Sequence, residues 1–129
     1  MRLCLFGHMT VWGEQDGVCF LTDPWFGPHT HLQRVLAART VPPHVVPEAL
    51  ARVQALLVSH HHLDHLDDIA LALACLLRWT VIGPETVARR ARRAGVAQVT
   101  ALRAGQSTTL GPLRIHALPA EHPLARDAV

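Results

Sequence analysis

The sequence predicts an α/β (α+β) domain, because strand-like and helix-like patterns alternate along the chain. Short apolar runs rich in β-branched residues, typical of buried strands, alternate along the chain with segments whose apolar residues recur at helical spacing. With 129 residues, of which 50% are hydrophobic and 17% charged, the chain has the length of one domain. Because no linker or internal repeat divides it, residues 1–129 are expected to form a single domain.

The first part of the chain is expected to form a β-hairpin followed by a long loop. Leu3–Trp12 and Val18–Leu21 have the pattern of its two strands, and Asp16-Gly17 supplies the turn. Residues 24–47 are rich in proline and lack periodicity, so we expect a loop there, with one short helix from Leu32 to Ala38.

Strands and helices alternate in the rest of the chain. Val53–Ser59 is apolar enough to be a buried strand, and a helix is expected to start near Pro84. Between them, apolar residues at helical spacing predict a helix over Leu66–Leu77: Leu66, Ile69, Ala70, Leu73, Ala74 and Leu77. Further short strands are expected at Thr80–Gly83, Val99–Leu102, Ser107–Leu110 and Leu113–Leu118.

Metal-competent side chains gather where the strand before Ser59 turns into the following helix. The run contains His60, His62, Asp64 and His65. Residues two apart in an extended backbone share a face, so His60 and His62 point to one side and His61 to the other. Imidazoles with a nearby carboxylate suit Zn²⁺ or another borderline divalent ion. The alternative is a solvated histidine-rich loop with incidental metal affinity, which would need neither the strand nor the helix.

Charge gives little information about partners. The net charge is +2, and the one basic run, Arg89-Arg90 with Arg92-Arg93, lies on a predicted helix whose other side is apolar. These arginines are therefore expected on a solvated outer face. A nucleic-acid partner is not expected, because the run lacks interleaved aromatic residues and a recognised binding module.

The chain is expected in the cytoplasm, with no transmembrane segment. No apolar run reaches the roughly 18 residues needed to span a bilayer, and the start of the chain has no signal-peptide pattern. Cys4, Cys19 and Cys75 are odd in number and lie in apolar segments, which indicates free thiols in a reducing compartment.

The pattern His60-x-His62-x-Asp64-His65 after an apolar strand resembles the signature of the metallo-β-lactamase fold superfamily of hydrolases. Three further segments resemble its lactonase-like and N-acyl-phosphatidylethanolamine phospholipase D-like branch. They are Gly7-His8-Met9-Thr10-Val11, Thr22-Asp23-Pro24 and Pro119-Ala120-Glu121-His122.

This resemblance implies an αββα sandwich, of which the chain would supply the first half: a mixed sheet with helices on one face. It implies that His60, His62 and His122 hold a first ion, and that Asp64 and His65 contribute to a second. Asp64 would also act in catalysis, by orienting the nucleophile or passing a proton. Asp23 would support a ligand from behind, and His8, on the first strand, is expected to be a hydrogen-bonded core histidine near the site in preference to a direct ligand. The alternatives are an ordinary exposed histidine at His122 and a turn-forming Asp-Pro at Asp23.

The resemblance also implies a metal-dependent hydrolase. One or two Zn²⁺ ions, or Mn²⁺ or Fe²⁺ in their place, would activate a hydroxide against a small-molecule ester, lactone, amide or phosphodiester. The alternative is a truncated, non-catalytic metal-binding or interaction module that keeps only the first metal site.

The family pattern is incomplete in this chain. A bridging aspartate and a last histidine belong to the second half of the fold, and Asp127 is too close to His122 to replace them. Without that half, an apolar sheet face would be exposed. We therefore expect a truncated reading frame, an isolated half that a complementing C-terminal half completes, or a homodimer.

Overall fold

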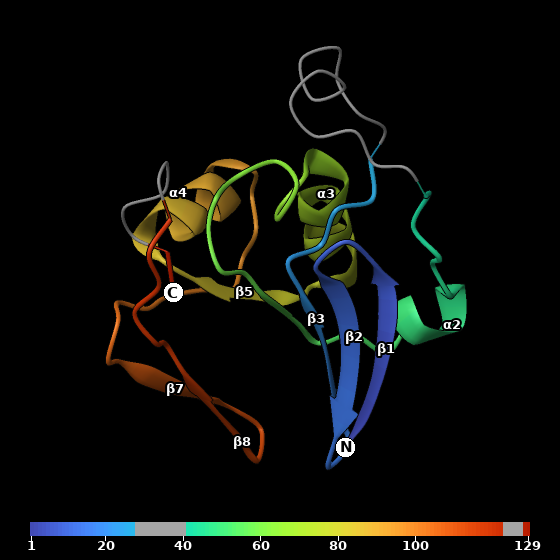
Figure 1. Cartoon of the computed structure of the whole chain (residues 1–129), viewed down its shortest axis with the longest axis horizontal. Helices are drawn as coiled ribbons and strands as arrows, with labels where there is room; N and C mark the ends of the chain where they lie inside the picture. The colour runs from blue at the N-terminus through green and yellow to red at the C-terminus, as the bar shows by residue number, and fades with distance from the viewer. Residues whose placement is uncertain (28–40, 123–127) are drawn as a thin grey trace.

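A mixed sheet of six strands forms the centre of the molecule in this computed structural model, which describes residues 1–27, 41–122 and 128–129 (Figure 1). The strands lie in chain order. The first three run antiparallel, and the last three run parallel to the third. The predicted α/β class is therefore confirmed. The strands are β1 (Arg2–Gly7), β2 (Thr10–Gln15), β3 (Val18–Thr22), β4 (Ala55–Leu57), β5 (Thr80–Gly83) and β6 (Val99–Ala101).

The beginning of the sheet differs from the prediction, because Leu3–Trp12 forms two strands instead of one. The chain reverses at Gly7 and His8, whose φ angles are 132° and 53°. Apolar residues lie on both sides of this reversal, so the composition of the segment does not reveal it. The predicted turn at Asp16-Gly17 is confirmed, with positive φ at both residues, as tight hairpins require.

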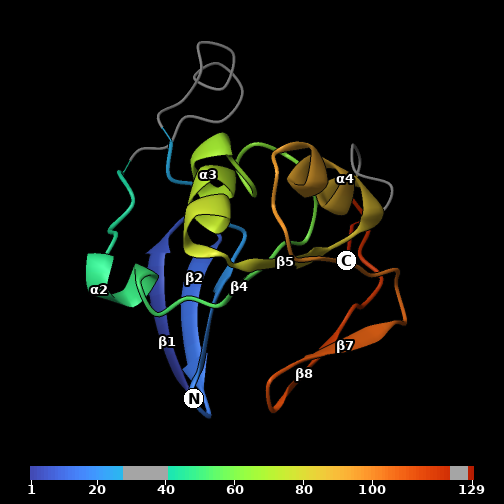
Figure 2. The same ribbon diagram turned by 180° about the vertical axis from the view of Figure 1, so that it is seen from behind.

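Two helices cover one face of the sheet (Figures 1 and 2). Helix α3 (Asp68–Leu77) connects β4 to β5, and α4 (Glu85–Arg93) connects β5 to β6. The face that α3 buries is rotated from the prediction, since Leu71 is buried while Ile69 and Leu77 are exposed. The main core lies between this face and the helices, and it includes Leu21, Leu56, Ala70, Ala74, Trp79, Val81, Val87 and Ala91.

A short helix that the sequence did not predict begins at the end of the proline-rich segment. Helix α2 (Pro47–Leu50) has a proline in its first turn, where the missing N–H costs nothing. Its Ala49 carbonyl accepts a hydrogen bond of 3.2 Å from Trp12 Nε1. The helix predicted at residues 32–38 lies outside the described residues.

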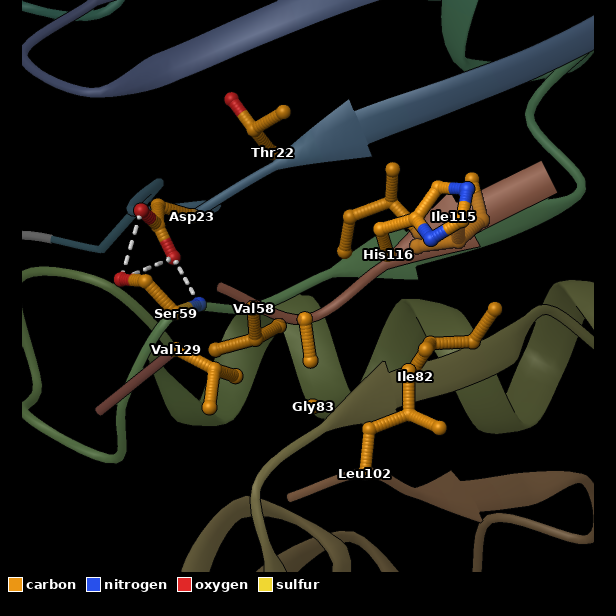
Figure 3. Close-up of a pocket in the computed structure, with 12 residues that line it drawn as sticks. Thr22, Asp23, Val58, Ser59, Ile82, Gly83, Leu102, Ile115, His116 and Val129 are labelled. Carbon is orange, nitrogen blue, oxygen red and sulfur yellow. Dashed lines mark hydrogen bonds between the residues drawn. The ribbon is translucent and has the colours of Figure 1, made fainter. Parts of the chain in front are cut away.

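The opposite face of the sheet is only partly covered. Strand register places Leu5, Val11, Thr22, Leu57 and Ile82 in one row on this face. The hairpin of β7 (Ser107–Leu110) and β8 (Leu113–His116) lies on this side of the sheet (Figure 1). Between them lies a cavity of about 250 Å³ (Figure 3). Among the described residues, no helix is long and apolar enough to cross a bilayer.

Candidate metal centre

The candidate site lies at the carboxyl ends of neighbouring parallel strands, where open α/β sheets place their ligands. Asp23 directly follows β3. The loop from Ser59 to His65 follows β4 and leads into α3 (Figure 2). The strands are parallel and in register, so both segments emerge at the same edge.

His60, His62 and His122 form a first group of donors. One ring nitrogen from each lies within 4.8 Å of the others. His60 Nε2 is 3.1 Å from His62 Nδ1, and the centroid of the His122 ring is 4.5 Å from that of His60. The structure thus brings His122, far along the chain, to the two histidines of the loop. Three imidazoles with an open fourth position are a donor set typical of Zn²⁺.

His8, Asp64 and His65 form a second group, whose donor atoms again lie within 4.8 Å of one another. Asp64 Oδ2 is 3.8 Å from both His8 Nε2 and His65 Nε2. The ring centroids of His60 and His65 are 4.0 Å apart, so the two groups are adjacent. The expectation of a core histidine at position 8 is wrong: His8 is an exposed residue of the turn between β1 and β2, because the strand ends at Gly7.

Asp23 contacts His65 of the second group directly and His60 of the first group through Ser59. Its carboxylate accepts hydrogen bonds from the Ser59 N–H (2.7 Å) and from Ser59 Oγ (2.9 Å), as Figure 3 shows. Asp23 Oδ2 is also 3.1 Å from His65 Nδ1, and Ser59 Oγ is 3.0 Å from His60 Nδ1. A carboxylate behind a histidine fixes the tautomer and direction of a ligand. Asp23 has a φ of 38°, so the same residue also turns the chain.

Asp67 anchors the end of the loop, and sequence reasoning missed it. This buried carboxylate accepts hydrogen bonds from the backbone N–H groups of Phe26 (2.6 Å), Gly27 and Ala70 (2.7 Å). It is the N-cap of α3. The signal was present, because an aspartate before an apolar periodic run is a typical helix start.

Arg90 anchors the loop from the other side, and its assignment to a solvated face is wrong. Its Nη1 donates to the carbonyl oxygens of His61 (3.2 Å) and Leu66 (2.5 Å). Its Nη2 donates to Asp68 Oδ1 at 2.7 Å. One guanidinium on α4 therefore ties together both ends of the loop that carries the donors.

The remaining histidines that the structure describes belong to neither group, although the ring centroid of His61 is 5.2 Å from that of His62. His61 belongs to neither group, and it lines a cavity of about 330 Å³ with Thr86, Arg89, Arg90 and Arg93. His44 and His116 are exposed. His29, His31 and Asp127 lie outside the described residues.

The two histidines at the centre of the site have opposite pKa shifts. Burial, followed by the charges of His65, His62 and His122, lowers the pKa of His60 from 6.5 to about 4. Burial also acts to lower the pKa of His65, but the hydrogen bond and charge of Asp23, with the charge of Asp64, outweigh it and raise that pKa. His60 is therefore neutral at neutral pH, as a metal ligand must be.

The metal-free chain is expected to lose stability as the pH falls, because His60 is easier to protonate in the unfolded chain. The contribution of His60 to stability is complete above pH 6.5 and is lost as the pH falls from 6.5 to about 4. At pH 5 the loss is about 2 kcal/mol relative to pH 7.5. Urea unfolding of the wild type and of His60→Gln at both pH values measures this His60 contribution. His65 acts in the opposite direction, since its contribution is lost as the pH rises through its raised pKa.

The variant His60→Gln separates the two effects, because it keeps His65 and removes only the titration of His60. Its stability should fall less than that of the wild type over the same interval. Equal losses in the two chains would contradict the assignment.

The fold and this site define the class: an α/β domain of metallo-β-lactamase type with two groups of histidine and carboxylate side chains that could hold metal ions. Residues 19–128 match the model of the beta-lactamase superfamily domain, and the chain belongs to that family. The predicted metallo-β-lactamase-like fold is thereby confirmed.

Individual relatives agree with this assignment. The chain is 37% identical over 121 residues to an uncharacterized protein of Mycobacterium tuberculosis, covering 91% of this chain and 32% of that protein. It is 36% identical over 73 residues to a UPF0173 metal-dependent hydrolase of Exiguobacterium, and the match covers 55% of this chain and 26% of that protein. The structure of Igni18, a metallo hydrolase from Ignicoccus hospitalis, superposes with a TM-score of 0.67 at 21% identity. The match covers 98% of this chain and 52% of that one. The chain thus spans between a quarter and about half of the length of these relatives.

Proposed function

We propose that this chain carries the metal centre of a metal-dependent hydrolase in the lactonase-like branch of its family. The observation that supports this most is the pair of adjacent donor groups at the carboxyl edge of the sheet. The name of the Exiguobacterium relative, a metal-dependent hydrolase, points to the same class. The substrate would be a small-molecule ester, lactone, amide or phosphodiester.

His60, His62 and His122 would hold the first ion, and Asp64 and His65 would contribute to a second. A bound divalent ion supplies a water of lowered pKa and polarises a carbonyl or phosphoryl oxygen. We propose Zn²⁺ because imidazole donors dominate, with Mn²⁺ or Fe²⁺ as substitutes. Asp64 would accept and pass the proton that the reaction releases.

The open sheet face suggests how the proposed enzyme is completed. The row from Leu5 to Ile82 begins with an exposed residue, since Leu5 is 64% exposed. Leu3, two residues before it on the same strand, is 59% exposed. We propose that a second copy of the chain or a complementing C-terminal half covers this face. All three cysteines are free, which supports a reducing, cytoplasmic compartment.

Replacing Asp64 with asparagine tests the hydrolase. We expect the zinc-loaded chain to hydrolyse an activated ester or phosphodiester weakly, and Asp64→Asn to lower kcat by about 100-fold or more, as loss of a proton-transfer group does. His116→Ala is the control, because His116 is exposed and belongs to neither donor group.

Two outcomes would contradict the proposal. Equal kcat values for Asp64→Asn and the wild type would exclude the proposed role of Asp64. A zinc-loaded chain that binds metal but hydrolyses neither substrate would favour the non-catalytic metal-binding module.

A further inference from the structure

The second donor group joins two segments that are distant in the sequence. Asp64 and His65 come from the loop before α3, whereas His8 comes from the turn between β1 and β2. Asp64 and His65 alone make only two ligands, and a stable protein site for zinc has at least three. The chain therefore needs one more donor if it is to hold a second ion by itself.

The backbone around His8 directs this side chain towards Asp64. The register of β1 and β2 shifts between Leu5 and Gly7, and His8 then adopts a left-handed conformation with a φ of 53°. Such conformations in residues other than glycine are uncommon and are concentrated at functional sites. Asp23, beneath the same donors, has a φ of 38°. Two of the four non-glycine residues with positive φ among the described ones thus belong to this site.

Packing fixes the turn in this place. The fully buried Thr10 follows it, and its hydroxyl donates to the Asp23 carbonyl (2.9 Å) and accepts from the Trp25 N–H (3.0 Å). The edge of the His8 ring meets the buried Trp25 ring at a centroid distance of 5.1 Å and the His65 ring at 5.3 Å. The turn is therefore attached to the same segment that carries Asp23.

We propose that His8 Nε2 is the third protein ligand of the second metal ion, together with Asp64 and His65. This inference deepens the proposed hydrolase function and rests on it. Asp64 Oδ2 lies 3.8 Å from both imidazole nitrogens, which is too long for a hydrogen bond. Ligands at about 2.0–2.1 Å around a tetrahedral ion are about 3.3–3.4 Å apart, so a contraction of about half an ångström would bring Asp64 to ligand spacing from each of the two imidazoles.

The test is metal stoichiometry with His8→Asn, since asparagine tolerates the left-handed backbone but its shorter side chain cannot reach the ion. The metal-free wild type should bind two equivalents of Zn²⁺ in calorimetric titration. His8→Asn should keep one and weaken the other by more than about 100-fold, beyond the loss expected for a residue that only supports a ligand. His116→Ala should bind both, and the melting temperatures of the metal-free chains should agree.

Cobalt provides a second readout. In His62→Ala, which leaves the first group with two donors, Co²⁺ should occupy the second site with the absorption bands of a histidine-carboxylate complex. Adding His8→Asn to that variant should remove these bands.

Several results would overturn the inference. These are a wild type that binds a single equivalent, a His8→Asn chain that binds two with unchanged affinity, or Co²⁺ bands that persist in the double variant. None of them depends on hydrolysis. An inactive chain that still loses its second equivalent in His8→Asn would refute the hydrolase and leave the ligand assignment standing.

Discussion

Replacing His62 with alanine is expected to abolish tight metal binding at the first donor group. His62 Nδ1 lies 3.1 Å from His60 Nε2, and its ring is 4.8 Å from that of His122, so its loss leaves two imidazoles. Two ligands do not hold Zn²⁺ against water and chelators, so the affinity of this group should fall by well over about 100-fold. Metal analysis after dialysis against a weak chelator measures the retained zinc.

His44→Ala is the matched control for this variant. His44 is an exposed histidine whose backbone N–H, and not its ring, donates to the Phe6 carbonyl. The control should retain the zinc of the wild type. If His62→Ala also retained it, the first group could not be the primary metal site.

The loop donors could be predicted because their geometry is local. His60, His62, Asp64 and His65 lie within six residues, and alternation in an extended strand followed by a turn is enough to bring them together. His122 could be assigned only through the family resemblance, because its proximity depends on the path of the chain after β8. No spacing rule connects these two parts of the sequence.

The proximity of His8 to Asp64 and His65 could not be predicted from the sequence for a different reason. Its position depends on a reversal at Gly7 and His8 that interrupts an otherwise regular strand pattern. Arg90 was misplaced because a run of arginines on a helix opposite small apolar residues resembles a solvated face. Only the tertiary structure shows that this guanidinium meets the carbonyls of His61 and Leu66.

The ends of strands were predicted best where glycines in the sequence mark the same ends that strand pairing gives in the structure. Thr80–Gly83 and Ser107–Leu110 match the structure at both ends, since glycines close or separate these strands. The strand after Val53 is shorter than predicted, Ala55–Leu57, because only three of its residues pair with β3 and β5. The apolar pattern continues beyond the hydrogen-bonded ladder.

The largest loss of stability is expected from Asp67→Ala. This residue is only 7% exposed, and its side chain is the acceptor for the N–H groups of Phe26, Gly27 and Ala70. Its removal leaves three backbone donors without that acceptor and α3 without its N-cap. A buried donor left unpaired costs about 1–3 kcal/mol, and the half-buried N–H groups of Phe26 and Gly27 add smaller losses to that of Ala70, so the free energy of unfolding should fall by about 3 kcal/mol. Urea unfolding of the metal-free chain measures this loss.

The neighbouring variant Asp68→Ala provides the comparison. Asp68 is 90% exposed at its side chain and pairs with Arg90 on the surface, so its removal should cost about 1 kcal/mol or less. Because Asp67 fixes the end of the loop that begins at Ser59, only Asp67→Ala should also weaken zinc binding. Equal unfolding free energies in the two variants would show that the three amides are satisfied without this carboxylate. In that case the loop would keep its conformation through Asp23 and Arg90 alone.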